Sequence, residues 1–450
     1  MTLWRTFCIV TLLVCASTVV AQEAAQPASA CSGNWCTWPT MTGDWCGVRT
    51  DLAEKGITLD IDVTQVFQHN MHGGRSTRSA AKYSGSTVLE LKLDTGKMGL
   101  WPGGSFTFLA DGVWGGGIDR KVGALLPTNL NAALPGSAEP GFGLNEGCRF
   151  LLSEFFYTQV LCECKLILLG GKLWGARAFD TNVFANNHRE QFMNVALRNN
   201  VLIPQFLPYT TMGVGVIVNP TDWLSILTAV ADSDGRAKTT GFETAFHGDT
   251  NTTVIHEWAF KVKPCNLPGN QRIGFIWSSK DFDRIDPMEP FDSTGELAIN
   301  MLGMKNALNV LGLLASYKEA GDNIAIYYNF DQYLYTEADD PSQGIGLFGR
   351  FGWARQDVSP VCHFYSIGMG GKGVIPTRDN DTCGLGYYYA DLSNQFPAMF
   401  HSEQGIELYY NIEICPWLHV SPDFQIIMNP GGTDDHDVSL VGGVRVNMKL

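Results

Sequence analysis

Three features are scarce in this 450-residue sequence: long apolar runs, basic residues and low-complexity segments. After Ala21 no stretch approaches the roughly 18–20 consecutive apolar residues that a membrane-spanning helix requires. Lys and Arg number 31 against 45 Asp and Glu, and the resulting net charge of −14 gives no support for nucleic-acid binding. Because no linker or repeat divides the chain, one large domain fits better than the two or three that its length allows.

The first residues are typical of a secretory signal peptide. Arg5 supplies a positive charge, residues 8–14 form a short apolar core, and small residues end at Ala21. We therefore expect residues 1–21 to be removed during export. A lipoprotein signal would use Cys15, but the bulky Val14 before it disfavours that alternative.

Export and composition together leave two classes of protein. The chain is 45% hydrophobic and 11% aromatic and contains 49 glycines, yet the sequence offers no spanning helix. It is therefore either a large soluble periplasmic protein or a closed β-barrel in a membrane. No third class fits, since only helices and closed barrels satisfy every backbone polar group in lipid.

Alternation of apolar and polar residues recurs along the chain and predicts β-strands. In residues 59–64 and 89–94 every apolar side chain falls on one face and every polar side chain on the other. The same period continues through residues 406–414 and 438–450. In lipid an outward Lys or Arg near the midplane costs roughly 2–4 kcal/mol, so the charged face of such strands must line the lumen.

Further features favour a membrane barrel over a soluble β-sandwich. The last predicted strand continues to the apolar Leu450, and strands of about ten residues suit a tilted span. Aromatic residues gather where we expect strand ends, as in an interfacial girdle: Tyr327, Tyr328, Trp353, Tyr387, Tyr388, Tyr389, Tyr409, Tyr410 and Trp417. The sequence therefore predicts an all-β fold, a transmembrane antiparallel β-barrel over residues 58–450.

Residues 22–57 do not follow the strand pattern. Thr42 or Asp44 could cap a short helix through Asp51–Lys55, and Gly56 would end it. We expect this helix on the periplasmic side of the barrel. Stretches rich in Gly and Pro predict loops at 101–104, 112–117, 135–143 and 429–437.

Ten cysteines follow the signal peptide, and export would permit their oxidation: Cys31, Cys36, Cys46, Cys148, Cys162, Cys164, Cys265, Cys362, Cys383 and Cys415. Cys162 and Cys164 should share one face of a strand, so each would pair elsewhere or remain free. A metal site is the alternative interpretation of this Cys-x-Cys pair, but no His-rich stretch accompanies it, and we predict no metal and no cofactor. The pairing of the cysteines cannot be derived from the sequence.

Four sets of residues, in order along the chain, resemble the carbohydrate-selective porin (OprB) family. The first is Thr42–Arg49 with Leu52–Ile57. The second comprises Gly171-Lys172, Phe179-Asp180, Phe184–Asn186, Gln191-Phe192, Asn219–Trp223 and Asp232–Gly235. The third is Phe348–Trp353 with Gly368–Gly373 and Gly384–Tyr387. The fourth is Glu407–Tyr410 with Pro416–Leu418, Pro422–Gln425 and Asn429–Gly432.

The resemblance implies a barrel of about sixteen strands in the outer membrane, and passive uptake of glucose and related sugars. The cysteines and the terminal Leu450, where the family commonly has an aromatic residue, depart from its pattern. A disulfide-reinforced barrel would account for the cysteines. We see no surface-layer anchoring domain before the barrel, so we do not expect a cell-wall-linking variant. Sugars and outer-membrane lipid are the expected partners, and a homotrimer is compatible with this interpretation.

Selectivity in such a barrel would be set at its narrowest point, where charged groups bind sugar hydroxyls and aromatic rings stack on the sugar face. The candidates are Glu154, Lys172, Arg177, Asp180, Asn186, His188 and Arg189, with Trp174 and Phe184 for stacking. Arg350 lies opposite Phe351 in its strand, so it should point into the lumen. Arg378 could lie at the pore mouth or in a loop ion pair. The alternative for Asp180 and Arg189 is a structural pair that fixes the loop.

Other patterns in the sequence carry less weight. Gly368–Gly373 matches G-x-G-x-x-G, but Pro376 blocks the helix that a nucleotide site needs, so a hairpin turn fits better. Asp434–Asp437 could ligate calcium but is more typical of a solvated loop. A barrel hydrolase, a soluble periplasmic sugar-binding protein and a general or anion-leaning porin are the alternative functions.

Overall fold

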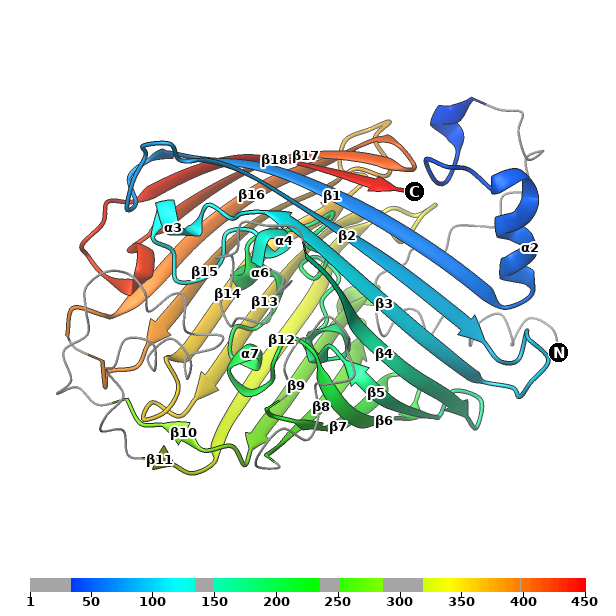
Figure 1. Ribbon diagram of the computed structural model, residues 1–450, viewed down its shortest axis with the longest axis horizontal. Coiled ribbons are helices and arrows are strands. Elements are labelled where there is room, and N and C mark those ends of the chain that lie inside the picture. The colour runs from blue at the N-terminus through cyan, green and yellow to red at the C-terminus, as the bar shows by residue number, and fades with distance from the viewer. Residues whose placement is uncertain (1–33, 134–148, 235–250, 286–318, 397) are drawn as a thin grey trace.

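Sixteen strands close into one antiparallel barrel, in which strands that follow one another along the chain pair and β1 pairs with β18 (Figure 1). The computed structural model describes residues 34–133, 149–234, 251–285, 319–396 and 398–450. The predicted transmembrane antiparallel barrel of about sixteen strands is confirmed. The predicted loop at 135–143 and the signal peptide lie outside the described residues.

The barrel strands are β1 (Ile57–His72), β2 (Ala81–Asp94), β3 (Gly104–Gly115), β4 (Arg149–Leu161), β5 (Leu166–Leu173), β6 (Thr211–Thr221), β7 (Leu224–Asp232), β8 (Thr252–Val262), β9 (Gly269–Ser278), β12 (Asn323–Thr336), β13 (Gly344–Ala354), β14 (Val361–Lys372), β15 (Thr382–Leu392), β16 (Ser402–Cys415), β17 (Leu418–Met428) and β18 (Ser439–Lys449). Strand β9 pairs with β12, because β10 (Phe282–Asp283) and β11 (Glu319–Ala320) form a separate two-stranded sheet.

The helices are short. They are α2 (Val48–Glu54), α3 (Asp119–Val122), α4 (Leu130–Ala133), α5 (Gly175–Ala178), α6 (Val195–Arg198) and α7 (Ile203–Phe206), with the 3₁₀ turns η1 (Trp35–Thr37), η2 (Trp45–Gly47), η3 (Pro264–Asn266) and η4 (Pro430–Gly432). None of the helices in the described ranges is long and apolar enough to cross a bilayer.

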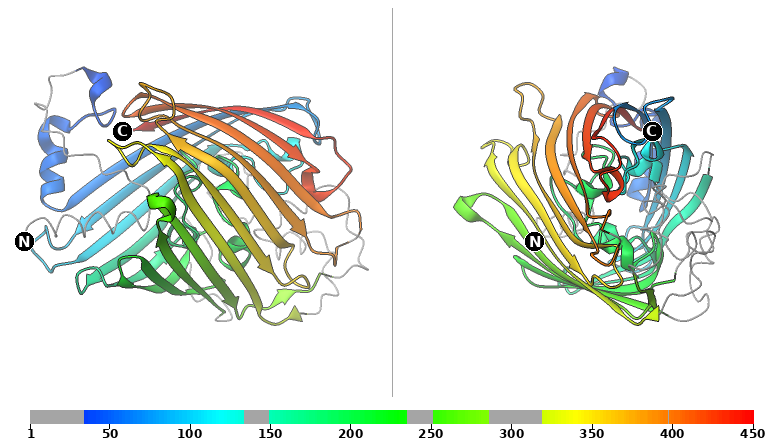
Figure 2. Two further views of the ribbon diagram at one scale, coloured as in Figure 1. Left: turned by 180° about the vertical axis from the view of Figure 1, so that it is seen from behind. Right: turned by 90° about the vertical axis from the view of Figure 1, so that its left-hand side faces the viewer.

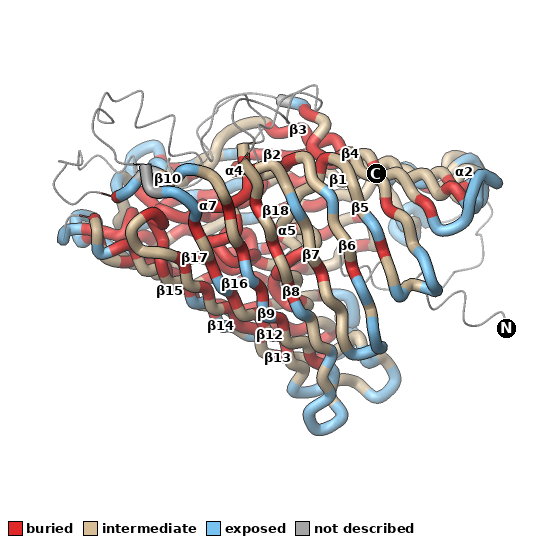
Figure 3. Tube along the Cα trace, turned by 90° about the horizontal axis from the view of Figure 1, so that it is seen from below, coloured by how far each residue is buried: buried red, intermediate tan, exposed pale blue. Residues whose placement is uncertain are grey.

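Side chains along the strands alternate between the lumen and the outer face. In β1, Thr64 and Gln68 are 1–2% exposed, whereas Phe67 beside them is 52% exposed. Figure 3 shows the same change between buried and exposed positions along other strands. Buried polar and exposed apolar side chains reverse the arrangement of a soluble protein, as expected when the outer face contacts lipid.

The two ends of the barrel differ in the length of their connections. At the end that carries α2, only Asp222 and Trp223 separate β6 from β7. At the opposite end, residues 174–210 separate β5 from β6. Because outer-membrane barrels have short periplasmic turns and longer extracellular loops, α2 lies on the periplasmic side (Figure 2).

The N-terminal helix forms close to where the sequence predicts it, but its cap differs. Gly47 occupies the N-cap position, while the Asp44 carboxylate accepts hydrogen bonds from the backbone N–H and the hydroxyl of Thr50 at 2.9 Å each. Gly56 follows the helix with φ +85°, a conformation that favours glycine. Arg49 donates to the carbonyls of Leu59 and Leu450, which joins the helix to both ends of the barrel sheet.

Three predictions about particular segments are wrong. Gly368–Gly373, predicted as a hairpin turn, lies within β14 as far as Lys372. Cys162 and Cys164 lie in the turn between β4 and β5, not on a strand face. Most of the predicted loop at 112–117 belongs to β3, which continues to Gly115. Among the described residues, support for the expected disulfide reinforcement is also missing, because these cysteines are free thiols: Cys36, Cys162, Cys265, Cys362, Cys383 and Cys415.

The aromatic girdle is only partly correct. Tyr327, Tyr388 and Tyr409 lie within strands, point into the barrel and are at most 2% exposed. The Tyr327 hydroxyl donates to Glu257 at 2.7 Å and that of Tyr388 to Glu403 at 3.1 Å. The side chains of these tyrosines point into the lumen because they lie on the same strand faces as polar residues such as Glu407.

Candidate functional site

The connection between β5 and β6, residues 174–210, contains α5, α6 and α7 and packs against the lumenal face of the barrel (Figure 1). We call it the inner loop. It makes contacts with opposite parts of the barrel wall, and these contacts define the candidate site.

One end of the inner loop is fixed by a buried ion pair. The Asp180 carboxylate lies 3.0 Å from Arg350 Nε, and neither side chain has any exposed surface. Arg350 also donates to the carbonyls of Ala185, Leu197 and Arg198 at 2.6–2.9 Å. Asn329 donates to Asp180 at 2.6 Å. The buried charges are therefore paired and hydrogen-bonded, as burial requires.

Carboxylates on the wall bind backbone N–H groups of the inner loop. Glu407 of β16 accepts from Met193 at 2.6 Å and Asn194 at 3.0 Å, and Glu257 of β8 accepts from Asp180 at 2.9 Å. From β18, Arg445 donates to the carbonyls of His188 and Gln191 at 2.8 and 2.6 Å. These charge-assisted bonds satisfy loop backbone groups that have no strand partner.

Glycines on β13, β14 and β15 allow the inner loop to approach the wall. A Cβ on Gly370 would lie 2.6 Å from Phe184 Cβ, and one on Gly384 would lie 2.8 Å from Phe192 Cζ. Phe184 packs edge-on against Tyr333 at 4.9 Å between ring centroids, and it is 5% exposed. Any larger residue at these glycines would occupy the space of a loop side chain.

The opposite part of the wall meets the inner loop through charges that keep some exposure. Arg177 lies 3.0 Å from Glu154 of β4 and 3.4 Å from Glu90 of β2, and Arg189 lies 2.7 Å from Asp62 of β1. Glu154 is 2% exposed, but the other four side chains are 22–33% exposed. We call Asp62, Glu90, Arg177 and Arg189 the charged cluster.

The remaining predicted site residues lie in different surroundings. Lys172 is buried and donates to the Leu152 carbonyl at 2.6 Å, and the Asn186 N–H donates to Gln191 at 2.8 Å. Trp174 packs on Tyr209 at 5.0 Å and beneath the Arg198 guanidinium at 4.2 Å.

Two predicted residues remain. His188 is buried in the inner loop, and its burial, with the nearby guanidinium of Arg198, holds the pKa of the imidazole well below its usual range. Arg378 is outside this site: it pairs with Asp381 at 2.7 Å in the turn between β14 and β15, at the periplasmic end. Of the two positions expected for Arg378, the structure shows the ion pair in a turn.

Sequence reasoning missed Glu257, Glu403, Glu407 and Arg445 as residues that hold the loops. The signal was present for two of them, because alternation places Glu407 and Arg445 on the polar faces of β16 and β18. Glu403 accepts from the N–H groups of Leu126 at 3.0 Å and Gly431 at 2.9 Å, so it holds two further connections.

Gly370→Leu tests whether the glycine-lined wall positions the inner loop. Overpacking typically costs about 1–3 kcal/mol, and the new side chain must displace Phe184. We expect a lower unfolding midpoint in denaturant and a changed single-channel conductance. Gly321→Leu is the matched control, since a Cβ there meets nothing within 4 Å. Equal behaviour of the two variants would show that the glycine is not needed for loop packing.

These features together define a class of protein. A closed antiparallel barrel with an apolar outer face, a polar lumen and a loop folded inside it is an outer-membrane porin. The chain belongs to the carbohydrate-selective porin, OprB family, whose model matches residues 78–450. Proteins of this family are passive channels in the outer membrane that admit sugars, so the hydrolase and soluble binding-protein alternatives are set aside.

Individual relatives agree with this assignment over most of their length. The chain is 23% identical to Porin B of Pseudomonas aeruginosa over 94% of this chain and 93% of the relative. It is 23% identical to the putative porin QuiX of Acinetobacter baylyi, over 91% and 93%. The high-pH structure of Pseudomonas putida OprB superimposes with a TM-score of 0.76 at 20% identity and covers 92% of this chain and 99% of that one.

Proposed function

We propose that glucose-type sugars cross the barrel beside the charged cluster, with Arg177 and Arg189 on the inner loop facing Glu90 and Asp62 on the wall. The observation that carries this proposal is that these four charges remain 22–33% exposed, whereas the Asp180–Arg350 pair of the same loop has no exposed surface. The Glu190–Lys449 pair, at 2.9 Å, keeps a similar exposure of 26% and 41% on the same loop. Trp174 begins the inner loop and is half-buried. Its ring would offer the surface on which a sugar stacks. We remove Asp180 and Arg350 from the lining because their side chains have no exposed surface, and Phe184 because only 5% of it is exposed.

The proposed mechanism is weak, repeated hydrogen bonding. Guanidinium groups donate to sugar hydroxyl oxygens and carboxylates accept from sugar hydroxyl protons, so both kinds of hydroxyl partner are available at one level of the lumen. Each of these charged groups already has an ionic partner between the inner loop and the wall. A sugar therefore replaces only part of the interactions that each group makes. Binding therefore stays weak enough for release, and no nucleophile or general base takes part.

Arg177→Ala and Arg189→Ala in planar bilayers test this proposal. Each change removes one cation and leaves a wall carboxylate without its partner, so we expect a shift of ion selectivity towards cations and weaker block of the current by glucose. Arg378→Ala is the control, because its ion pair lies in a periplasmic turn. If neither loop variant differs from the control, the constriction is elsewhere. If ion selectivity shifts without any change in sugar block, the anion-leaning porin is the better assignment.

Four further assignments are part of the proposal. The signal peptide would end at Ala21, which N-terminal sequencing of the mature protein tests. Residues 22–57 would form the periplasmic segment before a barrel domain that starts at 58. Outer-membrane lipid would cover the exposed apolar residues of the outer face, such as Ile367 and Leu408. A homotrimer would cover part of the same face, and the mass of the unboiled protein in detergent distinguishes the two arrangements.

A further inference from the structure

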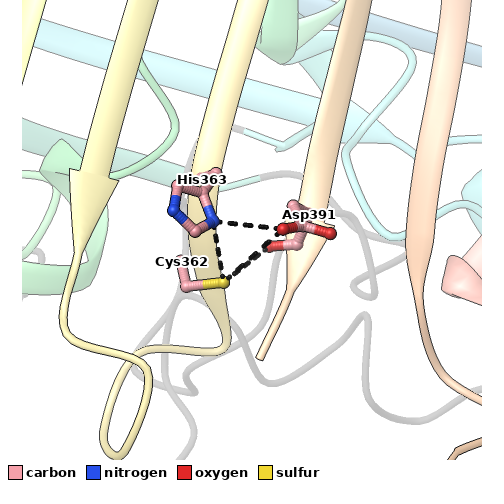
Figure 4. Close-up of side chains that lie close together, drawn as sticks. All are labelled: Cys362, His363 and Asp391. Carbon is pink, nitrogen blue, oxygen red and sulfur yellow. Dashed lines mark hydrogen bonds and ion pairs between the residues drawn. The ribbon is translucent and has the colours of Figure 1, made fainter. Parts of the chain in front are cut away.

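Three potential ligand atoms converge at the extracellular ends of β14 and β15 (Figure 4). Cys362 Sγ lies 3.4 Å from His363 Nδ1 and 3.9 Å from Asp391 Oδ2, and His363 Nδ1 lies 3.1 Å from the same carboxylate oxygen. Cys362 is 1% exposed, whereas the side chains of His363 and Asp391 are 26% and 36% exposed. The thiol therefore closes the inner side of the cluster, and the other two groups leave an approach from outside.

A β-bulge makes this convergence possible. In a regular strand Cys362 and His363 would point to opposite faces. Here Val361 pairs with Leu392 and His363 with Asp391, so Cys362 is an extra residue that opposes no partner. Bulges redirect side chains in this way and shift the register of the two strands by one residue. The bulge brings the thiol to the side where the imidazole and the carboxylate already face each other across the two strands.

The arrangement does not suit nucleophilic catalysis. In a Cys-His-Asp relay the thiol and the carboxylate must contact different ring nitrogens, because the imidazole passes a proton from one side to the other. Here both contact Nδ1. The thiol also has carbonyl acceptors, Asp391 at 3.6 Å and Leu392 at 3.5 Å, which account for its burial but not for its contact with the imidazole.

We propose that Cys362, His363 and Asp391 bind a zinc ion through sulfur, nitrogen and oxygen. Zinc takes these three ligand types in tetrahedral sites with bonds of about 2.0–2.3 Å, which places the donor atoms about 3.3–3.6 Å apart. The three observed separations of 3.1, 3.4 and 3.9 Å lie within a few tenths of an ångström of that range. The fourth position would be taken by water.

Binding would follow a simple proton balance. The Cys362 thiol loses its proton to solvent and binds as thiolate, Asp391 binds as carboxylate, and His363 binds through the Nδ1 lone pair with its ring proton on Nε2. One thiol proton is released for each zinc ion. Affinity should therefore rise with pH.

The bound ion would link two strands at the extracellular rim. Cys362 follows the β13–β14 connection, and Asp391 precedes the β15–β16 connection. Ser393 already joins these connections through its N–H to the Pro360 carbonyl at 2.9 Å. A metal ion beside this contact would hold both connections at a fixed separation and raise the stability of the rim by mass action.

Cobalt titration of the full-length mature barrel, folded in detergent and reduced with a non-chelating phosphine, tests the proposal. We expect one Co²⁺ per chain with a thiolate-to-cobalt absorption band in the near ultraviolet, and excess Zn²⁺ should remove the band. Cys362→Ser should abolish it, and His363→Ala and Asp391→Asn should each weaken cobalt binding by roughly tenfold or more. Zn²⁺ should raise the thermal midpoint of the unmodified protein but not that of Cys362→Ser.

The control variant is Cys383→Ser, a half-buried cysteine at the other end of β15, which should keep the band unchanged. Faster migration of unboiled protein in a gel verifies that each variant is folded. The absence of a band in the unmodified protein, or a band that persists in Cys362→Ser, would overturn the proposal. If Cys362→Ser does not fold, unchanged affinity in Asp391→Asn would overturn it as well.

Discussion

Arg350→Ala is expected to lower the free energy of unfolding by about 3–5 kcal/mol and to raise the single-channel conductance. Removing one partner of a buried ion pair leaves the other charge buried without compensation. Here Asp180 would be left, together with the carbonyls of Ala185, Leu197 and Arg198 that Arg350 now binds. The inner loop should detach from the wall. Denaturant titration in lipid vesicles and bilayer recordings measure the two effects.

Arg355→Ala is the matched control for Arg350→Ala. Arg355 pairs with Asp357 at 2.7 Å, but the side chains are 29% and 39% exposed, so about 0–1 kcal/mol should be lost. The double variant Asp180→Asn, Arg350→Gln should lose less stability than the sum of its single variants, because no unpaired charge remains. Equal losses in Arg350→Ala and Arg355→Ala would contradict the anchoring role.

Phe192→Ala is expected to cost about 3–5 kcal/mol, the usual range for emptying a packed aromatic site. Phe192 is 1% exposed, and it contacts Tyr409 edge-on at 4.8 Å and Phe348 at 5.4 Å between centroids. The glycines beside it have no side chains to fill the cavity. We expect a lower denaturant midpoint and noisier channel currents, because the inner loop would lose its aromatic contacts with Phe348 of β13 and Tyr409 of β16.

Phe67→Ala provides the comparison for Phe192→Ala. Phe67 is 52% exposed on the outer face of β1, so its removal creates no internal cavity. We expect a smaller loss of stability and unchanged channel currents. A Phe192→Ala channel that behaves like Phe67→Ala would show that the inner loop is held by its polar contacts alone.

The strands, and which of their side chains point into the lumen, were predictable from sequence. Alternation of apolar and polar residues is a local property, and contact with lipid requires it at each strand position. The polar faces of β1 and β18 carry Thr64 and Arg445 into the lumen as the pattern indicates. The tyrosines show the limit of compositional reasoning. Tyr409 alternates in step with Glu407, so its strand face was a better guide than the expectation of an aromatic girdle.

The arrangement of the site could not be derived from sequence, because its contacts join residues far apart along the chain. Asp180 meets Arg350 across 170 residues, and Met193 meets Glu407 across 214. Local patterns identify the charged residues but not their partners. The bulge at Cys362 was equally hidden, since regular alternation would separate Cys362 from His363.

The most direct test of sugar selectivity compares glucose with an uncharged oligoethylene glycol of the same hydrodynamic radius in bilayers containing the purified protein. If polar groups beside the inner loop bind sugar hydroxyls, glucose will reduce the ion current with a saturable dependence on concentration, while the glycol will produce only a weak, linear decrease. Identical responses to both solutes would mean that the lumen sorts molecules by size, and this would contradict a carbohydrate-binding constriction.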